Sequence, residues 1–191
     1  MDIDCKSTVL LAGGSSDDPA CLEDAIIIAM ASLAEARDPD IGGHGRRIEH
    51  YVAALARQLR FQDAYRAELS DDNLALLLKA AALHDIGKVQ VPDAITLSQL
   101  EYGDGSRYPQ AQAGRAMALS ARLMAVAEVY DALISPRSYR PAFTHETAVE
   151  LIRQGRGLHF DPDVVDAMLA IDEQFKTVAL QFSFQNFAGS I

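Results

Sequence analysis

The sequence of 191 residues predicts an all-α fold in a single domain. Apolar residues recur at intervals of three and four over several segments, and no segment alternates apolar and polar residues as a strand would. Hydrophobic residues make up 49% of the chain, enough to bury one core without disulfides. The only cysteines, Cys5 and Cys21, are too few for a disulfide framework, so a reducing compartment, the cytoplasm, is expected.

The first 17 residues differ from the rest of the chain. They contain a Gly-Gly-Ser-Ser-Asp run at 13–17 and no sustained apolar period, which predicts a flexible leader over residues 1–17. The domain itself is expected over residues 18–187. Asp18 and Pro19 form a helix cap and a first-turn proline. Four apolar residues then follow at helical spacing and predict the first helix: Leu22, Ile26, Met30 and Leu33.

Two further helices are predicted before the middle of the chain. One begins near His44 and has an apolar face of Ile48, Tyr51, Val52, Leu55 and Leu59. The next follows the cap Ser70 and covers residues 74–83, where apolar side chains lie nearly all round. Because such a helix has no polar face, it is expected in the centre of the core. It ends at His84 and Asp85.

The second half of the chain is also predicted to be helical. Residues 91–114 are rich in Gly, Pro, Ser and Gln and are expected to form a long loop. A helix then begins near Arg115 and carries Leu119, Leu123, Val126, Tyr130 and Leu133 at clean helical spacing. Thr144 and Asp161 cap two short helices. A last amphipathic helix carries Phe175, Val178 and Phe182.

The charge and hydropathy of the chain limit its partners. The net charge of -10 opposes binding to duplex nucleic acid and to anionic membranes, because both depend on fields of Lys and Arg. No apolar run reaches the roughly 18 residues that a membrane span needs. The net charge does not exclude binding of a small anionic ligand where arginines cluster locally.

His84 and Asp85 are the most specific chemical feature. An adjacent imidazole and carboxylate can bind one cation while the carboxylate bridges to another, although such a pair alone is more often a cap beside a half-buried histidine. His44 and Glu128, each on a predicted helix, complete a set of two imidazoles and two carboxylates that suits a divalent metal. Asp40, four residues before His44, adds a candidate fifth ligand.

Five segments together resemble the HD-GYP family. Residues 83–93, with His84-Asp85-Ile86-Gly87-Lys88, are similar to the metal-binding HD signature of that family. The others match, in the family's order, its entry segment, its GYP loop, the segment with the last metal ligand and the substrate arginines, and its closing segment: 30–47, 104–109, 121–140 and 157–165. The chain is therefore identified as a member of the HD-GYP family over roughly residues 20 to 180.

The resemblance implies a helical domain that uses iron or manganese to hydrolyse the bacterial second messenger cyclic di-GMP. Its metal ligands would be Asp40, His44, His84, Asp85 and Glu128, with Asp40 and Glu128 standing where the family usually has Glu and Asp. The resemblance assigns catalysis to Asp85 and Lys88, and substrate binding to Lys88, Arg137 and Arg140. Without it, the two arginines would be expected in a solvated loop.

The chain also departs from the family. Between Asp93 and Asp104 a block of a few dozen residues is absent, so about two helices of the usual HD-GYP core and three histidine ligands are expected to be missing. The histidine pair of the family falls on Gln99 and Leu100 here, and the glycine of GYP is Arg107. These departures imply that at most one ion is tightly held and that hydrolysis is impaired.

Four functions therefore stay open. The chain is an impaired cyclic di-GMP phosphodiesterase, a catalytically silent module that binds cyclic di-GMP or docks onto signalling proteins through its altered GYP loop, a one-metal phosphohydrolase of another nucleotide, or the decayed product of a deletion. Loss of two helices would expose apolar surface on their neighbours, which a partner or a second copy in a homodimer would cover.

Overall fold

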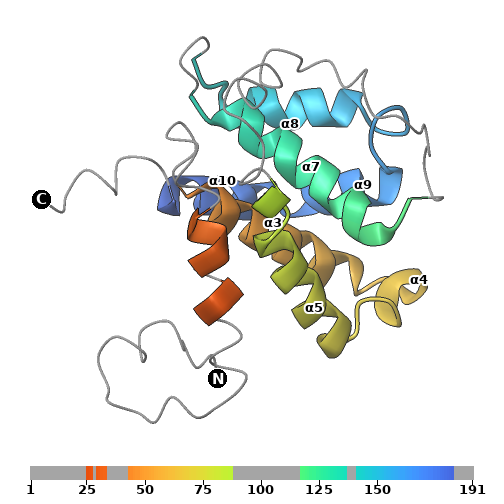
Figure 1. Ribbon diagram of the computed structural model, residues 1–191. Helices are drawn as coiled ribbons and strands as arrows, with labels where there is room; N and C mark the ends of the chain where they lie inside the picture. Colours follow the sequence, from red (N-terminus) through yellow and green to blue (C-terminus); the bar gives the residue numbers. More distant parts are fainter. Residues whose placement is uncertain (1–24, 28, 34–42, 88–116, 137–140, 183–191) are drawn as a thin grey trace, which may run out of the picture.

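The structure of the chain is a computed structural model that describes residues 25–27, 29–33, 43–87, 117–136 and 141–182. Over these ranges the regular secondary structure is helical and contains no strand, which confirms the predicted all-α class for the part of the chain described (Figure 1). The predicted leader, residues 1–17, and the predicted long loop, 91–114, lie outside these ranges. The expected loss of two helices therefore stays a prediction.

Helix α3, His44–Leu59, is the central element and contacts α5, α7, α9 and α10. Gly43 is its N-cap, and the φ of 76° at this residue is left-handed and suits glycine. The apolar face predicted for this helix is confirmed, because all its members are buried: Ile48, Tyr51, Val52, Leu55 and Leu59. The first residue of α3, His44, is buried as well, so the helix delivers a polar side chain directly into the interior.

Helix α5, Asp71–Ala82, does not occupy the centre of the core, and that prediction was wrong. Ser70 caps it by accepting a hydrogen bond from the backbone N–H of Asn73. Ala81 is its only buried residue, and Leu76 is 65% exposed. The helix packs against α3 along one face and lies on the outside of the molecule (Figure 1). The neighbouring helices that the structure describes therefore cover only part of the apolar surface of α5.

The C-terminal half contains α7 (Leu119–Ile134), α8 (His145–Gln154), α9 (Pro162–Ala170) and α10 (Asp172–Gln181). The predicted caps are confirmed, since Thr144 accepts from the N–H of Thr147 and Asp161 accepts from that of Asp163. One short helix, α4 (Asp63–Arg66), was not predicted.

Buried aromatic rings join these helices to α3. Tyr51 of α3 stacks on Phe175 of α10 with 4.6 Å between ring centroids, and the edge of the Tyr130 ring on α7 completes the cluster at 5.2 Å from Tyr51. The side chain of Arg122 binds Asp161 at 2.5 Å and thereby ties α7 to the start of α9. The aromatic cluster therefore links α3 to α7 and α10, and the ion pair links α7 to α9.

The segment predicted as the first helix is helical at 25–27 and 29–33. Its predicted apolar face is exposed at Ile26, Met30 and Leu33, so these side chains do not join the core of the described residues. The predicted helix start, Asp18 and Pro19, lies outside the described residues. Among the helices that the structure describes, none is long and apolar enough to cross a membrane.

Candidate metal centre

Three side chains from separate elements converge at one end of α3. His44 is the first residue of α3, His84 follows the end of α5, and Glu128 lies in the middle of α7. One ligand atom from each lies within 4.8 Å of the others, so the three are close enough to hold one metal ion together. His44 is buried, while His84 and Glu128 are partly buried, so the group lies at the edge of the core and is open to ligands.

The distances within this group match those between ligands of one ion. His84 Nε2 lies 2.9 Å from Glu128 Oε1, and His44 Nε2 lies 3.6 Å from Glu128 Oε2. Metal–ligand bonds of about 2.1 Å place neighbouring ligand atoms about 3.0 Å apart at right angles and about 3.4 Å apart in a tetrahedron. Glu128 therefore presents one oxygen to each imidazole at a spacing that a single divalent ion can bridge.

Both imidazoles place Nε2 near the carboxylate of Glu128. Nδ1 of His84 lies 2.6 Å from the carbonyl oxygen of Ala81, in the last turn of α5. A carbonyl only accepts, so Nδ1 carries the proton and Nε2 of the neutral ring is free to coordinate. In the same way, Nδ1 of His44 lies 2.8 Å from Oδ2 of Asp131 and donates to that carboxylate. The residues thus fit a divalent cation in both ligand type and tautomer.

Two buried atoms in the group also lack a hydrogen-bond partner. His84 Nε2 and Glu128 Oε1 face each other at 2.9 Å, yet neither makes a well-formed hydrogen bond. Buried polar atoms are rarely left in this state without an ion or a water between them. This local defect in the hydrogen bonding is independent of the ligand types and favours the same interpretation, a cation site.

The charges around the centre shift its protonation. Burial alone would lower the pKa of His84, but the nearby carboxylates of Asp85 and Glu128 favour the charged ring and raise the pKa to about 10. Burial alone would raise the pKa of Asp131, but hydrogen bonds from His44 and Arg47 lower it below its ordinary value. His84 therefore carries a proton on both ring nitrogens in the metal-free centre at neutral pH.

The structure describes some of the predicted site residues and not others. Asp85 lies beside the group, with Oδ2 at 3.5 Å from His84 Nε2 and 3.9 Å from His44 Nε2. The other four predicted site residues lie outside the described part of the chain: Asp40, Lys88, Arg137 and Arg140. Their roles stay predictions.

Sequence reasoning missed two residues that support the centre. Arg47 binds both oxygens of Asp131, from Nε at 2.6 Å and from Nη2 at 3.0 Å, and both side chains are 2% exposed. The missed signal was helical spacing, because Arg47 follows His44 by three residues and Asp131 follows Glu128 by three. Each pair therefore shares one helix face.

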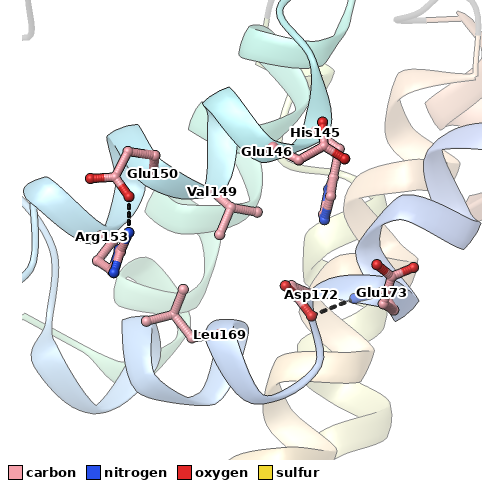
Figure 2. Close-up of a pocket in the computed structure, with 8 residues that line it drawn as sticks. All are labelled: His145, Glu146, Val149, Glu150, Arg153, Leu169, Asp172 and Glu173. Atoms are coloured by element: carbon pink, nitrogen blue, oxygen red, sulfur yellow. Dashed lines mark hydrogen bonds and ion pairs between the residues drawn. The ribbon is translucent and has the colours of Figure 1, made fainter.

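A separate groove lies between α8 and the helices α9 and α10, with a volume of about 340 Å³ (Figure 2). Val149 and Leu169 face each other across it. Carboxylates dominate the remaining lining, and two of them are already paired, Glu146 with Lys176 and Glu150 with Arg153. The groove contains none of the residues of the candidate metal centre.

Known proteins resemble this chain over most of its length. Two family profiles, both described as HD domain, match residues 41–118 and 94–164. A probable cyclic di-GMP phosphodiesterase of Vibrio cholerae is 38% identical over 93% of this chain and 50% of its own length. A cyclic di-GMP phosphodiesterase of the same organism is 37% identical over 83% of this chain and 42% of its own length. The response regulator RpfG of Xanthomonas campestris, a cyclic di-GMP phosphodiesterase, is 30% identical over 81% and 49%.

The chain thus spans about half the length of the curated relatives it matches. The alignment with the first relative extends over 224 residues, more than the 191 residues of this chain, so that relative has residues without a counterpart here. The predicted resemblance to HD-GYP domains is confirmed by these matches, and the chain belongs to the HD-domain family.

Proposed function

We propose that this chain, with residues 18–187 as its domain, is a metal-dependent phosphodiesterase of the HD-GYP type that acts on cyclic di-GMP. One observation carries the proposal: a ring nitrogen of His44, a ring nitrogen of His84 and a carboxylate oxygen of Glu128 all lie within 4.8 Å of one another. The activity printed for the relatives supplies the substrate class.

A divalent ion at this centre would polarise a phosphoryl oxygen and lower the pKa of a bound water. His44, His84 and Glu128 are the residues that would hold it. The carboxylate of Asp85 lies beside both imidazoles, and we assign it the role of accepting a proton from the attacking water. Lys88, three residues beyond Asp85, is proposed to pair with a substrate phosphate, as are Arg137 and Arg140 beyond the end of α7.

The position of the substrate also follows from charge. Cyclic di-GMP carries two phosphates, and the groove between α8 and α10 is lined by Glu146, Glu150, Asp172 and Glu173. Such a lining repels phosphate. A bound cation and the proposed Lys88, Arg137 and Arg140 give the opposite sign at the centre between α3 and α7, so the dinucleotide is assigned to that end of the domain.

We further propose that hydrolysis is impaired and that at most one ion, iron or manganese, is tightly held. The length of the alignment with the Vibrio relative supports a missing block, and the segment between Asp93 and Asp104 is its proposed place. The described ligands suffice for one ion. A second ion, which would stabilise the leaving oxygen, would need further imidazoles, and Gln99 and Leu100 cannot supply them.

The alternative is a catalytically silent module that binds cyclic di-GMP or a signalling protein. The small number of imidazoles favours this alternative. With one ion and its basic residues, the centre would retain binding of cyclic di-GMP more readily than its hydrolysis. Docking through residues 104–109 and pairing of two copies stay predictions, since that loop lies outside the described residues.

The deciding experiment loads purified protein anaerobically with Fe(II) or with Mn(II) and measures bound metal, cyclic di-GMP binding and cyclic di-GMP turnover. The test variants are Asp85→Asn and Glu128→Gln, and Glu150→Gln on the exposed face of α8 is the matched control. Slow turnover that Asp85→Asn and Glu128→Gln abolish and Glu150→Gln preserves supports the phosphodiesterase. Binding without turnover supports the silent module. Two stoichiometric ions with rapid turnover would contradict the proposed impairment.

A further inference from the structure

Asp131 is the most deeply buried carboxylate near the candidate metal centre, and it contacts the ligand group at the far ring nitrogen of His44. Its Oδ1 accepts from Arg47 Nε at 2.6 Å, while its Oδ2 accepts from Arg47 Nη2 at 3.0 Å and from His44 Nδ1 at 2.8 Å. Both carboxylate oxygens therefore accept hydrogen bonds from buried donors. One of those donors is the imidazole whose other nitrogen points at Glu128.

We infer that Asp131, held by Arg47, is a positioning residue that fixes His44 in the tautomer and orientation in which Nε2 can bind a metal ion. The inference rests on the proposed function only in taking His44 as a ligand. A carboxylate on the far nitrogen of a ligating histidine fixes the ring and makes the ligating nitrogen a stronger donor. Removing such a partner typically weakens metal binding about 10- to 100-fold.

Arg47 makes this support rigid. Its Nη2 also donates to Ser135 Oγ at 3.3 Å, and its Nη1 donates to the backbone carbonyl oxygen of Phe182 at 3.1 Å. The guanidinium thus joins α3, the end of α7 and the end of α10 around Asp131. Because Arg47 is anchored on several sides, the carboxylate cannot rotate to follow a different position of His44.

The alternative is that the pair serves only the fold. A buried ion pair whose charges satisfy each other is found in many cores and needs no functional role. The structure provides an internal comparison for this case, because Asp161 is also 2% exposed and is also paired with an arginine, Arg122, but contacts no candidate ligand. A purely structural role predicts that the two aspartates respond alike to the same substitution.

Asp131→Asn separates the two roles by chemistry. An asparagine of the same shape presents one oxygen and one amide NH₂ group. With NH₂ on the side of Oδ1, it would oppose the N–H of Arg47 Nε. With NH₂ on the side of Oδ2, it would oppose Nη2 of Arg47 and also donate to His44 Nδ1. The proton of His44 would then move to Nε2 and block the lone pair that faces Glu128.

The test compares wild type, Asp131→Asn and Asp161→Asn as full chains. Mn(II) affinity is measured by calorimetry, thermal unfolding is measured in chelator, and the tautomer of His44 is read from ¹⁵N spectra of the metal-free protein at a pH where the ring is neutral. We expect Asp131→Asn to bind Mn(II) about 10- to 100-fold more weakly than wild type. Asp161→Asn should bind like wild type even where it loses as much thermal stability. Wild type should show the proton of His44 on Nδ1.

Three results would count against the inference or its basis, and they are distinguishable. Equal Mn(II) affinity of Asp131→Asn and wild type would overturn the positioning role while leaving the proposed function intact. Absence of Mn(II) binding by wild type would overturn the proposed metal centre and the ligand role of His44 with it. If Asp131→Asn does not fold, the spectra of wild type still decide, because a proton on Nε2 of His44 would refute the inference without any variant.

Discussion

A divalent ion that binds this centre has to displace a proton from His84. Asp85 and Glu128 raise the pKa of the His84 imidazole from 6.5 to about 10 in the metal-free protein. At pH 7 a group with that pKa is protonated by about a thousand to one, so each ion that binds should release about one proton from His84. The apparent Mn(II) affinity should therefore rise about tenfold per pH unit between pH 6.5 and 8.5.

A histidine with an unshifted pKa would release a clearly different number of protons per ion. With its ordinary pKa of about 6.5, a histidine is only about one quarter protonated at pH 7 and would release about a quarter of a proton. The slope of affinity against pH would then flatten above about pH 6.5. The two cases differ fourfold in proton release at one pH, which is well within the resolution of calorimetry.

The assay is calorimetric titration of Mn(II) in buffers with different ionisation enthalpies, which yields the protons released per ion. Glu128→Gln removes one anionic neighbour of His84 and should reduce both proton release and affinity. His159→Gln replaces an exposed histidine on the loop after α8 and should change neither. Tight Mn(II) binding that releases a quarter of a proton or less at pH 7 would refute the reasoning about His84.

Three further predictions concern the stability of the metal-free protein. Because the pKa of His84 is raised in the folded protein, its protonated ring stabilises the fold fully below about pH 6.5, and this stabilisation is lost as the pH rises toward about 10. Urea unfolding in chelator at pH 6 and pH 9 should show the loss of stability. His84→Gln should make the difference between the two pH values smaller. Arg122→Ala leaves Asp161 buried without its partner and should cost about 3 to 5 kcal/mol in the same assay, against at most about 1 kcal/mol for Lys176→Ala in an exposed pair; equal costs would contradict the burial argument. Gly43→Ala forces a Cβ into a φ of 76° and should lower the unfolding free energy by about 1 to 2 kcal/mol, and an unchanged midpoint would show that the turn before α3 relaxes.

The sequence alone determined most of the helices that the structure describes. The apolar residues of α3 and α7 recur at helical spacing, and the caps Ser70, Thr144 and Asp161 are local signals that each act within a few residues. Such features depend on short stretches of chain, so they can be predicted without knowledge of the fold. The sequence could not place α5, because a helix that is apolar nearly all round gives no indication of which face will be covered.

The candidate site, like the fold, could be predicted from the sequence only in part. The residue types and the family resemblance by themselves point to His44, His84, Asp85 and Glu128. The tautomers of both histidines were decided by tertiary structure, since the partner of His84 is a carbonyl exposed by the end of α5 and the partner of His44 lies 87 positions away in sequence. Asp131 looks like an ordinary helical acid until α3 and α7 pack together. Its role arises from burial between those helices, where every donor and acceptor must find a partner and the arrangement of partners is fixed by the fold.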